Sequence, residues 1–274
     1  MNAGAFDLSG RVAMVTGACG FLGPRHARAL LVAGADLVVS DLDAGACREL
    51  ADVLRLEHPG RHVMAAAGDV TDPAALERLR DAVTAEHGRL DVLVNNAAVD
   101  DKVERSAEGA ERSRFERFPL QRFRHTLEVN VTGTFLACQV LGAPMAERGR
   151  GSIVNIASTY GLVAPDQRLY RRPDGDQTFW KGPAYPASKG AVLALTRFLA
   201  AYWGASGVRV NAVSPGGVDS GREPWFRERY AARAPLGRMA SPDEMDSAIV
   251  FLASDASSYV TDTNLVMDGG WTAW

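Results

Sequence analysis

Tyr185 and Lys189 are the two residues of this sequence whose types and spacing most directly suggest chemistry. They stand four positions apart in the run Tyr-Pro-Ala-Ser-Lys, so on a helix they lie one turn apart on the same face. A free tyrosine has a pKa of about 10 and is a poor base at neutral pH, and a nearby cation stabilises its phenolate. The pair therefore predicts an acid/base device. The same pattern also occurs in ordinary helices, where it places a buried tyrosine beside a surface lysine.

A glycine-rich turn near the amino terminus is the second feature with a chemical meaning. Gly17, Gly20 and Gly23 follow a short apolar run and lead directly into a helical pattern. Such a turn brings the backbone against a pyrophosphate and directs the N–H groups of the following helix at it. The sequence therefore predicts a dinucleotide site at this turn.

Asp41 indicates which dinucleotide that site would hold. It ends the next apolar run, 18 positions after Gly23, where a carboxylate accepts hydrogen bonds from ribose hydroxyls and repels a 2′-phosphate. Neither Cys19 nor Leu42 supplies a compensating cation, so NAD is favoured over NADP. Asp41 could also cap the helix that begins near Asp43, a role compatible with the first.

Short β-branched apolar runs alternate with longer helical patterns along the whole chain. The expected strands are residues 12–16, 36–40, 62–66, 90–94, 151–156 and 208–213, with 265–267 as a seventh. The expected helices are residues 22–33, 44–57, 73–87, 121–147, 184–204 and 242–253. Thr71-Asp-Pro-Ala and Ser241-Pro-Asp-Glu are start signals for two of these helices. This alternation predicts an α/β fold with a doubly wound parallel sheet of about seven strands and helices on both faces, in a single domain of residues 1–274.

Two segments interrupt the alternation and are expected to be loops around the substrate. Residues 99–120 are dense in charges of both signs, and residues 159–184 contain several Pro and Gly and show no period. Long irregular segments are uncommon in compact domains and often act as lids or binding loops. The alternative is that both are solvated surface excursions.

Composition argues against several classes of function. The 30 Lys and Arg against 33 Asp and Glu give a net charge of −3, which does not suit a nucleic-acid partner. No signal peptide or membrane span is apparent, and the three cysteines have neither disulfide-framework nor metal-site spacing. The five histidines are scattered. We therefore expect a cytoplasmic protein without a membrane partner or a metal site.

Three further features accompany Tyr185 and Lys189. They are Ser158 at the end of the fifth expected strand, Asn130 in a long helix, and the turn Asn95-Asn-Ala-Ala98. Together and in this order, these motifs resemble the classical short-chain dehydrogenase/reductase family, and the resemblance covers essentially the whole chain. It implies a Rossmann-type fold, NAD as cofactor, and direct hydride transfer between a secondary alcohol or ketone and the nicotinamide.

The resemblance also implies a role for each position. Tyr185 would exchange the proton, Ser158 would hydrogen-bond the substrate oxygen, Lys189 would lower the Tyr185 pKa and bind the nicotinamide ribose, and Asn130 would support a proton relay. The implied cofactor contacts are Gly17, Cys19, Gly20, Phe21, Leu22, Gly23, Asp41, Leu42, Asp69, Val70, Asn95, Ala97, Tyr185, Lys189, Pro215, Gly216, Val218 and Ser220. Two positions depart from the family pattern, because Phe21 stands where a glycine is common and Ala98 replaces a glycine that often closes the Asn-Asn-Ala turn.

The second insertion indicates a polar substrate. Ser158 and Tyr185 are 27 positions apart, a longer gap than in compact family members, and hydrogen-bonding side chains such as Tyr160, Gln167 and Arg168 fill the segment between them. Such groups suit a sugar, sugar acid, cyclitol or activated sugar, with an arginine of the insertion on a carboxylate or phosphate. Residues 158–167 and the ending 268–274 also resemble sugar-modifying members, and Trp271 could stack on a sugar.

Two other functions stay open. A 3-oxoacyl thioester reductase would use Arg117, Arg122 and Arg124 to meet an acidic carrier protein, although their interleaved carboxylates suit a solvated helix equally well. A catalytically silent NAD-binding sensor or scaffold is the third possibility, and an intact catalytic constellation argues against it.

Helix 184–204 is expected to take part in assembly. It is apolar on nearly every face, so one side would cover the sheet and the other would need a second subunit. The family resemblance implies a homotetramer, in which Trp271 and Trp274 would fill an interface.

Overall fold

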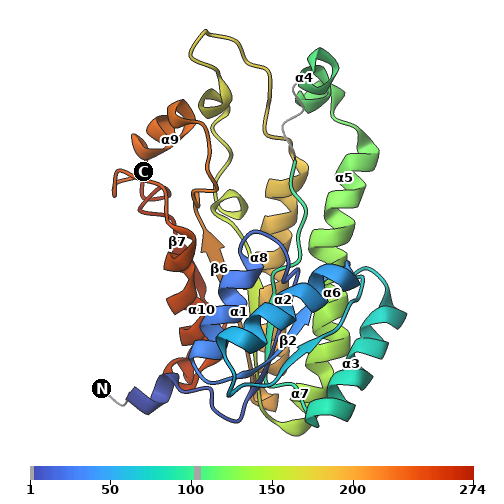
Figure 1. Ribbon diagram of the computed structural model, residues 1–274. Helices are drawn as coiled ribbons and strands as arrows, with labels where there is room; N and C mark the ends of the chain where they lie inside the picture. The colour runs from blue at the N-terminus through green and yellow to red at the C-terminus, as the bar shows by residue number, and fades with distance from the viewer. Residues whose placement is uncertain (1–2, 102–105) are drawn as a thin grey trace.

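The structure is a computed structural model that describes residues 3–101 and 106–274. Within these ranges seven strands form one parallel sheet in the order β3-β2-β1-β4-β5-β6-β7 (Figure 1). The strands are β1 Val12–Thr16, β2 Asp36–Ser40, β3 Val63–Ala65, β4 Val92–Asn95, β5 Gly151–Ile156, β6 Val208–Pro215 and β7 Asn264–Met267. Most are apolar on both faces and buried, as a parallel sheet covered on two sides requires. The predicted doubly wound α/β fold is confirmed.

The strand order reverses between β1 and β4. β1 pairs with β2 up to Thr16 with Ser40, and with β4 up to Thr16 with Asn95. From β1 the chain builds the sheet outward through β2 and β3, and from β4 it builds in the other direction. In open α/β sheets the crevice at such a reversal, outside the carboxyl ends of the strands, is where ligands bind.

One face of the sheet is covered by α1 (Gly23–Val32), α2 (Ala44–Glu57) and α10 (Asp246–Ala253). Leu30, Leu54 and Ile249 of these helices pack on Val15 and Val39 of the strands. The helix expected over 242–253 begins with a 3₁₀ turn, η8 (Pro242–Met245), which Ser241 and Glu244 close as a capping box. The start signal predicted there is confirmed.

The other face is covered by α3 (Pro73–His87), α8 (Ala184–Trp203) and one long helical run, Leu120–Arg148. The run consists of α5 (Leu120–Leu127), the π turn η3 (Glu128–Thr132), α6 (Gly133–Ala137), the π turn η4 (Cys138–Gly142) and α7 (Ala143–Arg148). By length and composition alone it could cross a membrane. Because Leu141 and Met145 pack on Met14 and Ile153 of the sheet, it is a core helix of this fold.

Two short helices that the sequence analysis did not predict, α4 (Ala107–Ser113) and α9 (Pro224–Ala231), lie with the two insertions beyond the carboxyl ends of the strands (Figure 1). The second insertion contains the 3₁₀ turns η5 (Thr159–Gly161) and η6 (Gln167–Tyr170). Residues 102–105 of the first insertion lie outside the described residues. The remaining 3₁₀ turns are η1 Ala3–Phe6, η2 Phe115–Arg117, η7 Gly204–Ser206 and η9 Asp255–Ser257.

The two insertions contact each other above the sheet. The Trp180 N–H donates to Ser113 Oγ at 3.0 Å, and the Gly182 N–H donates to Asp101 Oδ2 at 3.2 Å. The Arg114 guanidinium also lies 4.8 Å from the centre of the Trp180 ring. Both insertions therefore border the same region, next to the start of α8.

Candidate active site

The glycine turn between β1 and α1 is shaped by close backbone approaches. Gly17 has φ +60°, and a Cβ there would lie 2.6 Å from Ala97 Cα. A Cβ on Gly23 would lie 2.5 Å from the carbonyl oxygens of Gly17 and Ala18. At Gly20 the nearest atom, the Gly17 oxygen, would be 3.3 Å away. Gly17 and Gly23 are therefore required by the local backbone, whereas Gly20 keeps the surface of the turn small.

Asp41 ends β2 and faces the glycine turn. Its Oδ2 accepts a hydrogen bond from the Cys19 N–H at 2.9 Å, and its Oδ1 accepts one from the Leu42 N–H at 2.7 Å. The alternative role as a helix cap is wrong, because Asp43 caps α2 by accepting from the N–H groups of Gly45 and Ala46. The Asp41 carboxylate is thus fixed at the mouth of the turn.

A cavity of about 720 Å³ opens at the carboxyl ends of the strands, where the strand order reverses. It brings together the predicted residues Gly17, Cys19, Gly20, Phe21, Leu22, Asp41, Leu42, Asp69, Val70, Ala97, Tyr185 and Lys189. Gly68, Thr71, Asn96, Ala98, Val99, Asp100, His125, Glu128, Val129 and Ile156 complete its lining. Residues that are far apart in sequence, from the glycine turn to α8, therefore share one cavity.

Asn95 does not line this cavity, although the family resemblance implied a cofactor contact there. Its Nδ2 donates to Asn155 Oδ1 at 2.9 Å in the core, so the side chain points into the sheet. The next residue, Asn96, lines the cavity and donates from Nδ2 to the carbonyl oxygens of Thr16 and Gly17. Asn96 therefore holds the glycine turn, a role that the sequence analysis did not predict.

The segment that follows β6 lies at the same edge of the sheet but does not contribute to the cavity lining. Pro215 ends β6, and Cβ atoms on Gly216 or Gly217 would meet Asp268 or Tyr230. Val218 forms a bridge with Ala240. The implied contacts Pro215, Gly216, Val218 and Ser220 thus stay predictions, as does Gly23, which packs inside the turn.

Tyr185 lies in the first turn of α8, where it lines the cavity and is hydrogen-bonded through its side chain to Ser158. Burial is the main influence on the pKa of Tyr185 and raises it, and the charge of Asp100 raises it further. The hydrogen bond with Ser158 lowers this pKa. Ser158 itself follows β5, and its Oγ accepts from the Tyr160 N–H at 3.1 Å.

Lys189 is buried, and its ammonium donates to the Ile156 carbonyl oxygen at 2.6 Å. Burial lowers the pKa of Lys189 to about 8, whereas the charge of Asp100 raises it. The ammonium lies 5.6 Å from the centre of the Tyr185 ring. The expectation that Lys189 lowers the Tyr185 pKa stays a prediction.

Asn130 lies in the π turn η3 and links three parts of the site. Its Oδ1 accepts from the Val99 N–H at 2.8 Å, and its Nδ2 donates to the Val99 carbonyl at 2.9 Å. Nδ2 also donates to Ser188 Oγ at 2.9 Å, and Ser188 Oγ donates to the Tyr185 carbonyl at 2.8 Å. Asn130 therefore ties the start of the first insertion to the first turns of α8.

The four residues predicted for the substrate behave differently from one another. Tyr160 lies beside the site, with its hydroxyl 3.3 Å from that of Tyr170. Gln167 instead hydrogen-bonds the backbone of Lys181 through both its Nε2 and its Oε1, so its amide is occupied within the loop.

Arg168 and Trp271 make their observed contacts within the chain, and their roles toward a substrate stay predictions. The side chain of Arg168 is 82% exposed and paired with Asp166, because these two residues close a local turn. Trp271 is 5% exposed and stacks on Tyr230 at 4.2 Å, in an intramolecular cluster that includes Leu169.

Lys181 and Asp100 are functional candidates that the sequence analysis missed. Lys181 forms an ion pair with Asp100, and its ammonium lies 4.7 Å from the centre of the Tyr185 ring. The chain has three lysines, at 102, 181 and 189, so two of them stand four positions before and four positions after Tyr185. The small number of lysines, and the equal spacing of two of them about Tyr185, could have indicated Lys181 from the sequence.

The charged groups of the cavity are mostly acidic. Among the described lining residues, Asp41, Asp69, Asp100 and Glu128 carry carboxylates, Lys189 carries the ammonium, and none is an arginine. The arginine of the insertion that was expected to meet a substrate anion is thus not found there. Arg172, for example, pairs with Asp174 at the surface.

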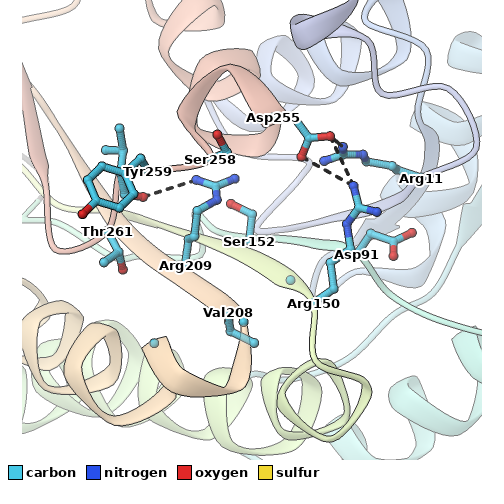
Figure 2. Close-up of a pocket in the computed structure, with 14 residues that line it drawn as sticks. Arg11, Asp91, Arg150, Ser152, Val208, Arg209, Asp255, Ser258, Tyr259 and Thr261 are labelled. Carbon is cyan, nitrogen blue, oxygen red and sulfur yellow. Dashed lines mark hydrogen bonds and ion pairs between the residues drawn. The ribbon is translucent and has the colours of Figure 1, made fainter.

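A second cavity, of about 510 Å³, lies at the opposite edge of the sheet and is lined by the first residues of β5 and β6 (Figure 2). Its arginines are occupied: Arg11 and Arg150 pair with Asp255, and Arg209 donates to carbonyl oxygens at the end of α10. It shares no lining residue with the cavity that contains Tyr185. Within residues 3–101 and 106–274, no group of three or more His, Cys, Asp or Glu side chains could hold a metal ion.

Comparison with known proteins agrees with this geometry. A family model described as short chain dehydrogenase matches residues 11–170, and one described as enoyl-(acyl carrier protein) reductase matches residues 174–272. D-threitol dehydrogenase of Mycolicibacterium smegmatis is 41% identical over 272 residues, covering 97% of this chain and 95% of that protein. Cis-4-hydroxycyclohexanecarboxylate dehydrogenase of Sinomonas cyclohexanicum is 37% identical, with 96% and 97% covered. The crystal structure of a gluconate 5-dehydrogenase from Burkholderia cenocepacia in complex with NADP and tartrate matches with a TM-score of 0.84 and 30% identity, covering 98% of each chain.

Proposed function

The chain belongs to the short-chain dehydrogenase/reductase family and is an oxidoreductase that acts on a CH–OH group, and on that premise we propose its cofactor, its catalytic residues and its substrate class. The proposed reaction is the NAD(H)-dependent interconversion of a secondary alcohol and a ketone on a small polar substrate. The observation that carries the proposal is the cavity shared by the glycine turn, Asp41, Tyr185 and Lys189.

The part of the cavity that is lined by the glycine turn and Asp41 fits a dinucleotide. Gly17 is packed too closely on Ala97 to carry a side chain, so the backbone of the turn faces the cavity directly and would hold a pyrophosphate. Asp41 would bind the adenosine ribose, and its charge supports NAD, although a related gluconate 5-dehydrogenase was crystallised with NADP. When bound, the nicotinamide supplies the hydride donor or acceptor.

The proton chemistry is assigned to the residues at the start of α8. Tyr185 would exchange a proton with the substrate oxygen, and Ser158, its hydrogen-bond partner, would orient that oxygen. Because burial raises the pKa of Tyr185, the phenol is protonated at neutral pH and ready to donate when a ketone is reduced. Lys189, which donates to the Ile156 carbonyl, would bind the nicotinamide ribose. Asn130 would support a proton relay and, through its hydrogen bond to Ser188, hold the first turns of α8 in position.

A polar substrate is supported by the names of relatives and by the loops around the site. D-threitol dehydrogenase and gluconate 5-dehydrogenase are named for a polyol and a sugar acid. Residues 99–120 and 159–184 would be the substrate loops, and they meet beside Tyr185 through Asp100 and Lys181. We propose a sugar, sugar acid, cyclitol or activated sugar as substrate.

Turnover of both dinucleotides across a panel of polyols, sugars, sugar acids, cyclitols and 3-oxoacyl thioesters tests this proposal, followed by the absorbance of reduced nicotinamide. We expect activity on polar alcohols with NAD and its loss in Tyr185→Phe, while cofactor binding is retained. Tyr259→Phe is the matched control, because Tyr259 is fully exposed at the opposite edge of the sheet. Activity confined to thioesters would overturn the substrate class.

The thioester alternative draws on the family model described as enoyl-(acyl carrier protein) reductase. Two of the arginines proposed to meet an acidic carrier protein already have partners within the chain, because Arg117 lies near Glu111 and Arg122 lies over the Phe118 ring.

A silent NAD-binding sensor would bind the dinucleotide and turn over none of the panel. Wild-type turnover that Tyr185→Phe abolishes would exclude it.

A further inference from the structure

One ion pair joins the two insertions at the active site. The Lys181 ammonium of the second insertion contacts the Asp100 carboxylate of the first. The Lys181 side chain is only 7% exposed, whereas that of Asp100 is 42% exposed and lines the cavity next to Tyr185. The lysine therefore stands behind the carboxylate, and the carboxylate is the group presented to the cavity.

Both partners of this pair are held in place by hydrogen bonds to neighbouring residues. Gln167 fixes Lys181, because its Nε2 donates to the Lys181 carbonyl and its Oε1 accepts from the Lys181 N–H, both at 2.9 Å. Asp100 Oδ1 accepts from the Asp101 N–H at 2.7 Å. The Lys181 ammonium also lies over the rings of Tyr185 at 4.7 Å and Tyr160 at 6.0 Å. The carboxylate of Asp100 thus has a defined position before any substrate arrives.

The charge of Asp100 reaches the proposed reacting groups. Asp100 lines the same cavity as Tyr185 and Lys189, and the ammonium paired with it lies 4.7 Å from the centre of the Tyr185 ring. The charge of Asp100 raises the pKa of both residues. Asp41, Asp69 and Glu128 add further negative charge along the described lining of the same cavity. The positive charge of Lys181 is already neutralised by Asp100, which leaves little to attract a substrate anion.

We propose that Asp100, positioned by Lys181, accepts hydrogen bonds from substrate hydroxyls next to the reacting carbon and selects neutral polyols over hydroxy acids. An ionised carboxylate only accepts hydrogen bonds, so hydroxyl groups suit it and a substrate carboxylate is repelled. The inference rests on the proposed function and narrows its substrate class.

The test compares kcat/KM for a neutral tetritol with kcat/KM for the hydroxy acid of the same chain length. We expect the wild-type enzyme to favour the tetritol by at least about 10-fold, since like charges at a binding site repel each other. Asp100→Asn should lower kcat/KM for the tetritol by about 10- to 100-fold, the range for a hydrogen bond to a charged group. The hydroxy acid should lose less or gain, so the ratio of the two substrates should fall.

Asp174→Asn is the matched control. Asp174 is also an ion-paired carboxylate of an insertion, but its pair with Arg172 is exposed, so the substrate ratio should stay at the wild-type value. Lys181→Met is the second variant and tests the positioning role. It should raise KM for the tetritol more than it lowers kcat, while the Kd for NADH, measured by fluorescence, stays within about twofold.

The outcomes separate the two proposals. A wild-type enzyme that turns over polyols, together with an unchanged substrate ratio in folded Asp100→Asn, overturns the role of Asp100 and leaves the proposed function standing. A wild-type preference for the hydroxy acid also overturns the proposed role of Asp100. If the wild-type enzyme turns over no member of the full panel of polyols, sugars, sugar acids and cyclitols, the proposed function fails and this inference fails with it. If Asp100→Asn does not fold, the KM change in Lys181→Met decides.

Discussion

The Lys189 ammonium donates a hydrogen bond of 2.6 Å to the Ile156 carbonyl oxygen, which ties α8 to the carboxyl end of β5. The lysine is buried, and burial lowers its pKa to about 8 from the value of 10.5 expected for an exposed lysine. A charge held in this position costs stability, and charges perturbed by burial cluster at functional sites. The burial of the Lys189 charge can therefore be tested through the pH dependence of the free energy of unfolding.

We expect Lys189→Met to change how the stability of the protein depends on pH. Between about pH 8 and 10.5 the unfolded chain holds a proton that folded Lys189 has lost, so the free energy of unfolding of the wild type should gain about 1–3 kcal/mol as the pH rises. Lys189→Met should lack this gain. Urea unfolding of both proteins at several pH values measures the difference, and parallel pH profiles would contradict it.

Asp41 is expected to decide the choice between NAD and NADP. The double variant Asp41→Ser, Leu42→Arg loses the carboxylate that repels a 2′-phosphate and gains a cation beside that phosphate. The ratio of kcat/KM for NADP to that for NAD should rise by about 10- to 100-fold. Asp43→Ala is the control, because it removes the cap of α2 and should cost about 1 kcal/mol of stability without moving the ratio. A wild-type preference for NADP would contradict the assignment.

Gly17→Ala should be far more damaging than Gly20→Ala. At Gly17 the φ of +60° and a Cβ only 2.6 Å from Ala97 Cα combine, so we expect a loss of about 2–4 kcal/mol in the free energy of unfolding. At Gly20 the nearest atom to a new Cβ is 3.3 Å away, and the loss should stay below about 1 kcal/mol. Unfolding of the proteins without cofactor separates the two, and equal losses would show that the turn is not held as described.

The fold could be predicted largely because its elements follow local rules. The helices expected over 44–57 and 73–87 begin and end where α2 and α3 do, since capping residues and apolar periodicity both act within a few positions. The helices α4 and α9 were missed because seven or eight residues make too few turns for an apolar period to be recognised. For α9, Pro224 at its first position was the available start signal.

The cofactor end of the site could be predicted because its residues end strands or begin helices at one edge of the sheet. Gly17, Asp41 and Tyr185 converge there for that reason. The substrate end could not be predicted, because Gln167 and Trp271, which were assigned to it, have partners far away in the sequence. Gln167 holds the backbone 14 positions away at Lys181, and Trp271 stacks on Tyr230.

Phe198 and Tyr202 on α8 should form part of a subunit interface in the homotetramer that we propose. They are 61% and 67% exposed, and their rings stack at 5.7 Å, so the chain presents a flat aromatic surface to the outside. Each aromatic ring gains about 1.5–3 kcal/mol when it is buried, a gain that repeats in every subunit. Phe198→Glu should therefore shift the assembly toward smaller species in sedimentation velocity at micromolar concentration. Leu56→Glu, at a position on α2 that is exposed on the other face of the sheet, is the control and should leave the assembly intact. A wild-type protein that sediments only as a monomer would refute the interface.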